Sequence, residues 1–149
     1  MSSLREFMSD DHRHCDDLFA DIEKAVADKR WSDAEASMAR FQKAMAAHFA
    51  SEEEVLFPAF EEATGMSVGP TQVMRMEHEQ MRELLSELAA ALAQHDRDDS
   101  LGQAETLLIM MQQHNMKEEG ILYPMCDQHL TSSLAPLLSM LRERLPGHG

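Results

Sequence analysis

The sequence contains two copies of one pattern, separated by 66 residues. The segment HFASEEEVLFP, residues 48–58, matches HNMKEEGILYP, residues 114–124, with His, Glu, Glu, Leu and Pro at the same relative positions. The same offset carries Asp11-His12 onto Glu77-His78. A chain with two equivalent halves of this kind folds most simply as two hairpins of the same design that face each other.

Apolar residues recur at steps of three and four through both halves, which is the period of an amphipathic helix. This pattern predicts helices over about residues 4–26, 32–59, 70–92 and 100–125. Four such helices with short loops favour an all-α fold, an antiparallel up-down-up-down four-helix bundle over about residues 4–127. A leucine-rich segment at about 132–145 predicts a short additional C-terminal helix that packs on the bundle or on another subunit. We expect a single domain, residues 1–149.

Short motifs predict where these helices begin and end. Two pairs have the spacing of a capping box: Ser32 with Glu35, and Ser100 with Gln103. We expect helices to begin at the two serines, because such a pair satisfies the free N–H groups of a first turn. Gly65 suits the position just past a helix end, where the left-handed conformation is common. Pro58 and Pro124 each remove a helical hydrogen bond, so we expect a kink near them.

Each half places a His on its first helix and a His-x-x-x-Glu motif on its second. The i,i+4 spacing stacks imidazole and carboxylate on one helical face, and in both halves that face is the apolar stripe. The hairpins would therefore bring six polar side chains into the bundle interior: His12, His48, Glu52, His78, His114 and Glu118. An isolated buried carboxylate is costly. No Lys or Arg lies on the stripes near this level, so metal is the simplest compensation.

Four imidazoles and two carboxylates fit two metal ions better than one. If each Glu bridges, each metal receives two His nitrogens and two Glu oxygens, and positions stay open for a bridging oxygen, water or a small ligand. These donors suit Fe, Mn or Zn, and no thiolate cage for a structural zinc is apparent. Without metal, the same six residues would form a hydrogen-bonded core network in an interaction module.

Two histidines compete for the place on the first helix. His12 follows the 66-residue repeat, whereas His14 maps onto Gln80 and lies on another face. We therefore assign His12. Three further histidines are expected at the surface: His95, His129 and His148.

The net charge argues against some classes of partner, and the low cysteine content indicates the cellular compartment. The chain has 13 Lys and Arg against 27 Asp and Glu, a net charge of −14. A field of this sign repels phosphate, so we expect neither nucleic acid nor a membrane surface as a partner. Two cysteines are too few for a disulfide scaffold, and neither a signal peptide nor a transmembrane run of about 20 residues is visible. We expect a cytoplasmic protein.

The D-H, E-H and repeated H-x-x-x-E-E-x-x-L-[FY]-P motifs resemble the hemerythrin-like (HHE cation-binding) family over about residues 4–127. Within that family, the stretch from Gly69-Pro70 to Glu77-His78 is most similar to the bacterial di-iron proteins for repair of iron centres. Those proteins use four His and two bridging Glu. The resemblance implies two iron ions, with a bridging oxo or hydroxo group, on the six residues named above: His12, His48, Glu52, His78, His114 and Glu118.

The coordination positions left open by six protein ligands on two metals, together with this resemblance, favour a non-haem di-iron protein that binds or senses a small diatomic ligand, oxygen or nitric oxide, or that stores and donates iron. The alternative is a di-iron oxidoreductase that reduces oxygen, peroxide or nitric oxide with electrons from a separate donor. The sequence shows no flavin or nicotinamide site, so a binding protein is favoured over an enzyme. Oxygen-carrying hemerythrins place an extra His where this chain has Met74, which argues against oxygen carriage. A homodimer through the C-terminal helix is a further expectation.

Residues beside the six have expected roles of their own. Glu53 and Glu119 are expected to be solvated or to orient a His. Tyr123 could donate a hydrogen bond near the site, but Phe57 at the repeat-related position favours ordinary packing. Cys15 and Cys126 are expected to be small buried hydrophobic residues rather than redox thiols.

Overall fold

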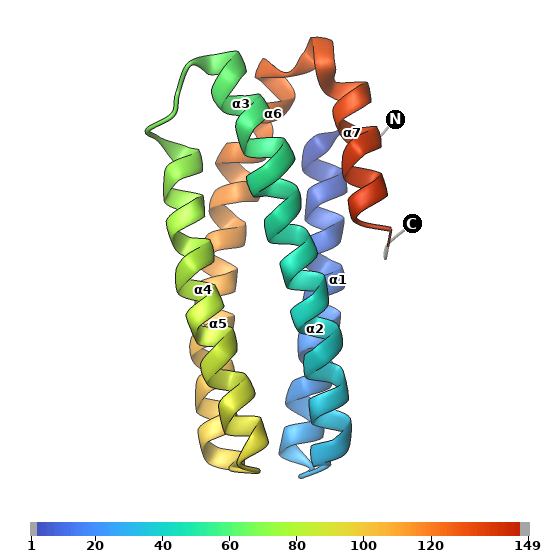
Figure 1. Cartoon of the computed structure of the whole chain (residues 1–149), viewed down its shortest axis with the longest axis vertical. Coiled ribbons are helices and arrows are strands. Elements are labelled where there is room, and N and C mark those ends of the chain that lie inside the picture. The colour runs from blue at the N-terminus through green and yellow to red at the C-terminus, as the bar shows by residue number, and fades with distance from the viewer. Residues whose placement is uncertain (1–2, 147–149) are drawn as a thin grey trace.

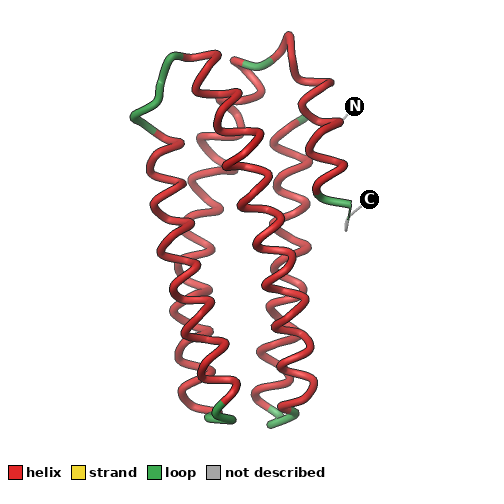
Figure 2. Tube along the Cα trace, in the orientation of Figure 1, coloured by secondary structure: helices red, strands yellow, loops and turns green. Residues whose placement is uncertain are grey.

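The computed structural model describes residues 3–146, and its long helices form the up-down-up-down bundle that the sequence predicts (Figure 1). Along the chain the elements are α1 (Leu4–Ala27), α2 (Trp31–Ser51), the π-helical turn η1 (Glu52–Leu56), α3 (Phe57–Thr64), α4 (Pro70–Ala93), α5 (Arg97–Lys117), the π-helical turn η2 (Glu118–Leu122), α6 (Tyr123–His129), the 3₁₀ turn η3 (Thr131–Ser133) and α7 (Leu134–Arg144). Residues 3–146 contain no β-strand (Figure 2). The predicted fold class is confirmed.

The helix ends differ in part from the sequence prediction. Gly65 ends α3 in the left-handed conformation with φ of 71°, as expected. The prediction that two capping boxes begin α2 and α5, however, is wrong. Helix α2 begins after Arg30 with no side-chain cap, and α5 begins three residues earlier than predicted because Asp96 accepts a hydrogen bond from the backbone N–H of Asp99 at 3.0 Å. Ser100 is therefore a buried residue inside α5.

The two prolines follow π-helical turns and do not interrupt the long helices. In η1 the N–H of Phe57 donates to the carbonyl of Glu52, five residues earlier. Pro58 then lies in the first turn of α3, where its missing N–H matters least. The carbonyl of Glu53 accepts from Nη1 of Arg75 at 3.4 Å. The kink expected at each proline is thus a widened turn, a feature that is frequent at functional sites.

The apolar core consists of two clusters. One cluster fills the bundle between α1, α2, α4 and α5 around Phe19, Phe41 and Leu107. The other joins the π turns and the short helices, and it includes Leu56 and Leu141. The apolar face of α7 therefore packs on the bundle of its own chain. No helix within residues 3–146 is long and apolar enough to cross a membrane.

Candidate metal centre

The six side chains singled out in the sequence meet in the bundle interior. Each of the four long helices contributes one His, and each π turn contributes one Glu as its first residue. All six are almost completely shielded from solvent: His12, His48, Glu52, His78, His114 and Glu118. The structure thus brings together every residue of the predicted set.

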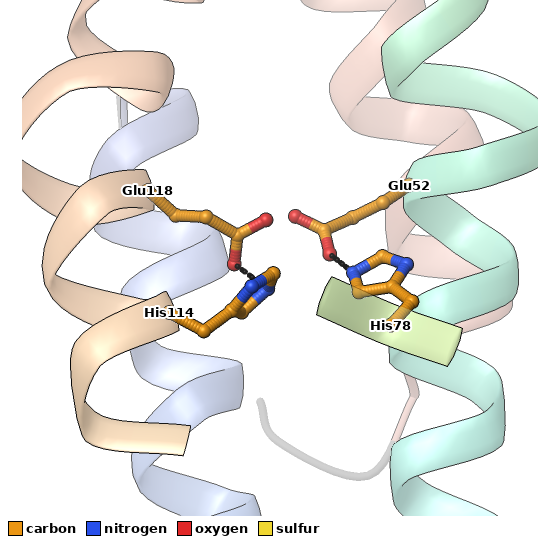
Figure 3. Close-up of side chains that lie close together, drawn as sticks. All are labelled: Glu52, His78, His114 and Glu118. Atoms are coloured by element: carbon orange, nitrogen blue, oxygen red, sulfur yellow. Dashed lines mark hydrogen bonds and ion pairs between the residues drawn. The ribbon is translucent and has the colours of Figure 1, made fainter. Parts of the chain in front are cut away.

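The donor atoms of these side chains form two groups that share one residue. Atoms of Glu52, His78, His114 and Glu118 lie within 4.8 Å of one another, and so do atoms of His12, His48 and Glu118. Figure 3 shows the carboxylates of Glu52 and Glu118 pointing toward each other from opposite sides of the first group. Glu118 belongs to both groups. This is the arrangement expected if a carboxylate bridges two cations.

Every histidine of the centre has its Nδ1 atom held by a carboxylate. The four pairs are His12–Glu119 at 2.7 Å, His48–Asp11 at 2.6 Å, His78–Glu53 at 2.7 Å and His114–Glu77 at 2.8 Å. A carboxylate at Nδ1 fixes the ring orientation and the tautomer, so Nε2 is left for a metal. Accordingly, Nε2 of His12 and of His78 lie 3.0 Å from oxygens of Glu118 and Glu52, respectively.

Cationic side chains hold two of these outer carboxylates in turn. Nη2 of Arg82 donates to Oε1 of Glu53 at 2.8 Å, and Lys117 pairs with Glu77. Burial raises the pKa of Glu53, but the hydrogen bonds from Arg82 and His78 outweigh it and leave the pKa below the usual value. The carboxylate is therefore ionised and suited to accept from the imidazole.

When no cation is bound, protonated histidines stabilise the buried glutamates of the centre. Burial lowers the pKa of His114, but the charge and hydrogen bond of Glu118 outweigh burial and raise it to about 9. The pKa of His48 is also raised, because Glu52 and Asp11 more than offset its burial. Burial raises the pKa of Glu118, yet His114 holds it well below the usual range. Metal ions and protons therefore compete for these nitrogens.

Two buried polar atoms of the centre make no well-formed hydrogen bond among the described residues. Oε2 of Glu118 is one, and Nε2 of His114, which has only an ion-pair contact with Oε1 of Glu118 at 3.2 Å, is the other. An unsatisfied buried donor or acceptor costs about 1–3 kcal/mol. A cation between these atoms would satisfy both, so the residues present fit a metal with nitrogen and oxygen ligands.

A model of the hemerythrin HHE cation binding domain matches residues 3–126. The chain belongs to the hemerythrin HHE cation-binding family. No curated protein and no solved structure shows a significant match to it. The hemerythrin domain and the buried His/Glu groups together make this a metal-binding bundle.

The hemerythrin bundle separates the two histidines that competed in the sequence. His12 faces the centre, whereas His14 is half-buried and lines a surface pocket with residues of α2 and the end of the chain. Of the histidines expected at the surface, His95 and His129 are exposed, and His148 lies outside the described residues. Cys15 and Cys126 are free and buried as expected, and burial raises the pKa of the Cys15 thiol to about 12.

Three residues of the hemerythrin site were not assigned from the sequence. Asp11 and Glu77 belong to the D-H and E-H motifs, but no role of their own was predicted for them, although the repeat places an acid before a His in both halves. Tyr123 was expected to pack like Phe57. It is fully buried, but its hydroxyl donates to Oε2 of Glu52 at 2.8 Å and contacts Oε1 of Glu118 at 3.0 Å. Ordinary packing therefore does not describe Tyr123.

A small enclosed cavity of about 10 Å³ adjoins the centre on the side away from the π turns. Three of the histidines line it together with Phe49, Asn115 and four sulfur-bearing residues: Cys15, Met45, Met81 and Met111. The offset of 66 pairs Cys15 with Met81 and Met45 with Met111. The cavity is about the size that one water occupies. It could admit only a very small ligand.

Proposed function

We propose that this chain is a non-haem di-iron protein that binds a small diatomic ligand, oxygen or nitric oxide, at the buried centre. The observation that carries the proposal is the pair of donor groups that share Glu118. Each histidine in them turns Nε2 inward because a carboxylate holds Nδ1. Two groups of inward-facing donor atoms that share one carboxylate suit two cations better than one.

One metal would be held by Glu52, His78, His114 and Glu118, and the other by His12, His48 and Glu118. When bound, an iron pair supplies open coordination positions and electrons for a small ligand. The protein supplies a fixed, dry site. The outer carboxylates orient the imidazoles, and the two apolar clusters exclude bulk water on both sides.

The cavity beside His12, His48 and His114 supports a diatomic ligand rather than a larger substrate. Apart from the three histidines of the centre, the residues that line it have neutral side chains and offer no charged group to an ionic substrate. Storage and donation of iron is the other candidate function for the same centre. An exchange assay distinguishes it, because a stored ion leaves to a chelator acceptor much faster than a fixed cofactor does.

The test is anaerobic reconstitution of the purified chain with iron, followed by metal analysis and titration with nitric oxide or oxygen. We expect about two irons per chain and a stoichiometric ligand complex with its own absorption spectrum. His12→Ala should lower the iron content, whereas the matched control His14→Ala should not. Well below one iron per chain would rule the proposal out. Many turnovers of oxygen or nitric oxide with an electron donor would assign the centre to an oxidoreductase instead.

A further inference from the structure

Tyr123 breaks the internal symmetry of the centre. The aromatic rings at the two repeat-related positions lie almost identically against a histidine. The ring of Tyr123 is 5.6 Å from that of His12 at an interplanar angle of 27°, and the ring of Phe57 is 5.7 Å from that of His78 at 22°. The main chemical difference between these two positions is one hydroxyl group, which only the second half carries.

That hydroxyl lies between the two donor groups: its shortest contact is with Oε2 of Glu52 at 2.8 Å, and its other three contacts are all with donors of one metal position. Oη of Tyr123 is 3.3 Å from Nε2 of His12 and 3.4 Å from Nε2 of His48. It is also 3.0 Å from Oε1 of Glu118, the carboxylate shared by both groups. The other donor group already has four members, whereas this one has three among His and Glu.

The distances are those between neighbouring ligands of a single ion. Two ligand atoms that each lie about 2.1 Å from one metal are roughly 3.0 Å apart at a right angle and about 3.4 Å apart in a tetrahedron. Oη keeps such distances to both imidazole nitrogens and to the Glu118 oxygen. Nε2 of His12 and Oε1 of Glu118 are separated by 3.0 Å as well.

We infer that the Tyr123 oxygen is a seventh protein ligand, at the metal position formed by His12, His48 and Glu118. Both positions then have four protein donors, but of different chemistry, with a phenolate oxygen, whose proton is released to solvent when the metal binds, in one and a second carboxylate in the other. The two ions are therefore inequivalent despite the repeat. This inference rests on the proposed metal centre and adds the assignment of one more ligand to it.

The sequence makes a direct test possible, because Tyr123 is the only tyrosine. Protein grown on ring-deuterated tyrosine and loaded with ferric iron should show phenolate ring vibrations that shift with the label in resonance Raman spectra. Tyr123→Phe should abolish these vibrations and the visible phenolate-to-iron absorption band. In a Zn²⁺ titration of the same variant, the second equivalent should bind at least about tenfold more weakly and the first should be unchanged.

The reverse exchange provides the matched variant. Phe57→Tyr combined with Tyr123→Phe should restore the phenolate band, because the ring at position 57 is placed in the same way beside His78. Label-insensitive spectra in wild-type protein that holds two irons would overturn the ligand assignment alone. A wild-type chain that binds no iron would overturn both this inference and the proposed function.

Discussion

Oδ2 of Asp11 lies 2.6 Å from Nδ1 of His48 and joins α1 to α2 in the bundle interior. Three equivalent pairs complete a ring around the bundle. Glu53 joins η1 to α4 through His78, Glu77 joins α4 to α5, and Glu119 joins η2 back to α1. Each helix is thus held to its neighbour at the level of the centre by a carboxylate–imidazole bond. We call these four carboxylates the outer layer: Asp11, Glu53, Glu77 and Glu119. The outer layer fixes both the histidine ligands and the packing of the helices.

Replacing Asp11 with Asn should weaken metal binding without unfolding the bundle. The amide keeps the size of the side chain but loses the charge that orients and polarises His48. Loss of such a partner typically costs about 10–100-fold in metal affinity. Competition with a chelator of known affinity measures the change. Asp10→Asn is the control, because Asp10 is exposed and pairs with Arg13 on the surface; equal affinity of the two variants would contradict the role of Asp11.

Glu118 and Glu52 should differ in what their removal does to metal content. Oxygens of Glu118 lie in both donor groups, whereas those of Glu52 lie in one. Glu118→Gln should therefore reduce occupancy of both positions, and Glu52→Gln should retain more metal. Metal analysis after dialysis checks this order. Glu54→Gln is the control, since Glu54 is exposed and pairs with Arg144, and it should keep the wild-type content; a reversed order of the two core variants would show that Glu118 is not shared.

The metal-free protein should lose stability as the pH rises from about 6.5 to about 9. The folded-state pKa of His114 is about 9, above its usual 6.5, so its protonated form stabilises the fold below pH 6.5 and this contribution is lost as pH rises through 9. The loss is at most about 3 kcal/mol. Glu118 has the opposite sign: its lowered pKa stabilises the fold above 4.5, and that contribution is lost as pH falls.

Thermal unfolding of metal-free and metal-loaded protein across this pH range measures the effect. The metal-free Tm should fall between pH 6.5 and 9. The loaded protein should not show this fall, because the metal holds the imidazoles without protons and binds more tightly as protons become scarce. A metal-free Tm that is flat or rises over the same interval would contradict the proton-stabilised centre.

The size of the sulfur-lined cavity should control ligand binding. Cys15→Met introduces at position 15 the methionine that already occupies the repeat-related position 81. Its longer side chain should fill the cavity. Binding of nitric oxide should weaken while iron content stays at the wild-type level. Cys15→Ala should enlarge the cavity and leave binding as strong or stronger. Overpacking costs about 1–3 kcal/mol, so Tm is measured alongside. Equal ligand affinity of both variants would place the ligand elsewhere.

The sequence predicted the bundle and the inner six residues because both depend on periodicity. The spacing of His48 and Glu52 needs only the geometry of one helix, and the repeat transfers it to the second half. The boundaries were less accurate: Asp96 caps α5 in competition with Ser100, a choice that depends on the loop that precedes the helix.

The outer layer could not be predicted in the same way. Glu119 contacts His12 across 107 positions of sequence, and the π turn determines how Glu118 and Glu119 divide between the inside and the edge of the bundle. The sequence predicts one continuous α-helix through that segment and does not predict the π turn. The role of Tyr123 was missed for a related reason, because its phenyl ring packs like Phe57 while its hydroxyl reaches the acids.

Anomalous diffraction at the iron edge from crystals of the reconstituted protein tests the central claim most directly. We predict two iron peaks between the four histidines, one within bonding distance of Nε2 of His78 and His114 and the other within bonding distance of Nε2 of His12 and His48. Glu118 should contact both ions. A single peak, or iron peaks only at surface carboxylates while the interior keeps its direct His–Glu hydrogen bonds, would contradict the account.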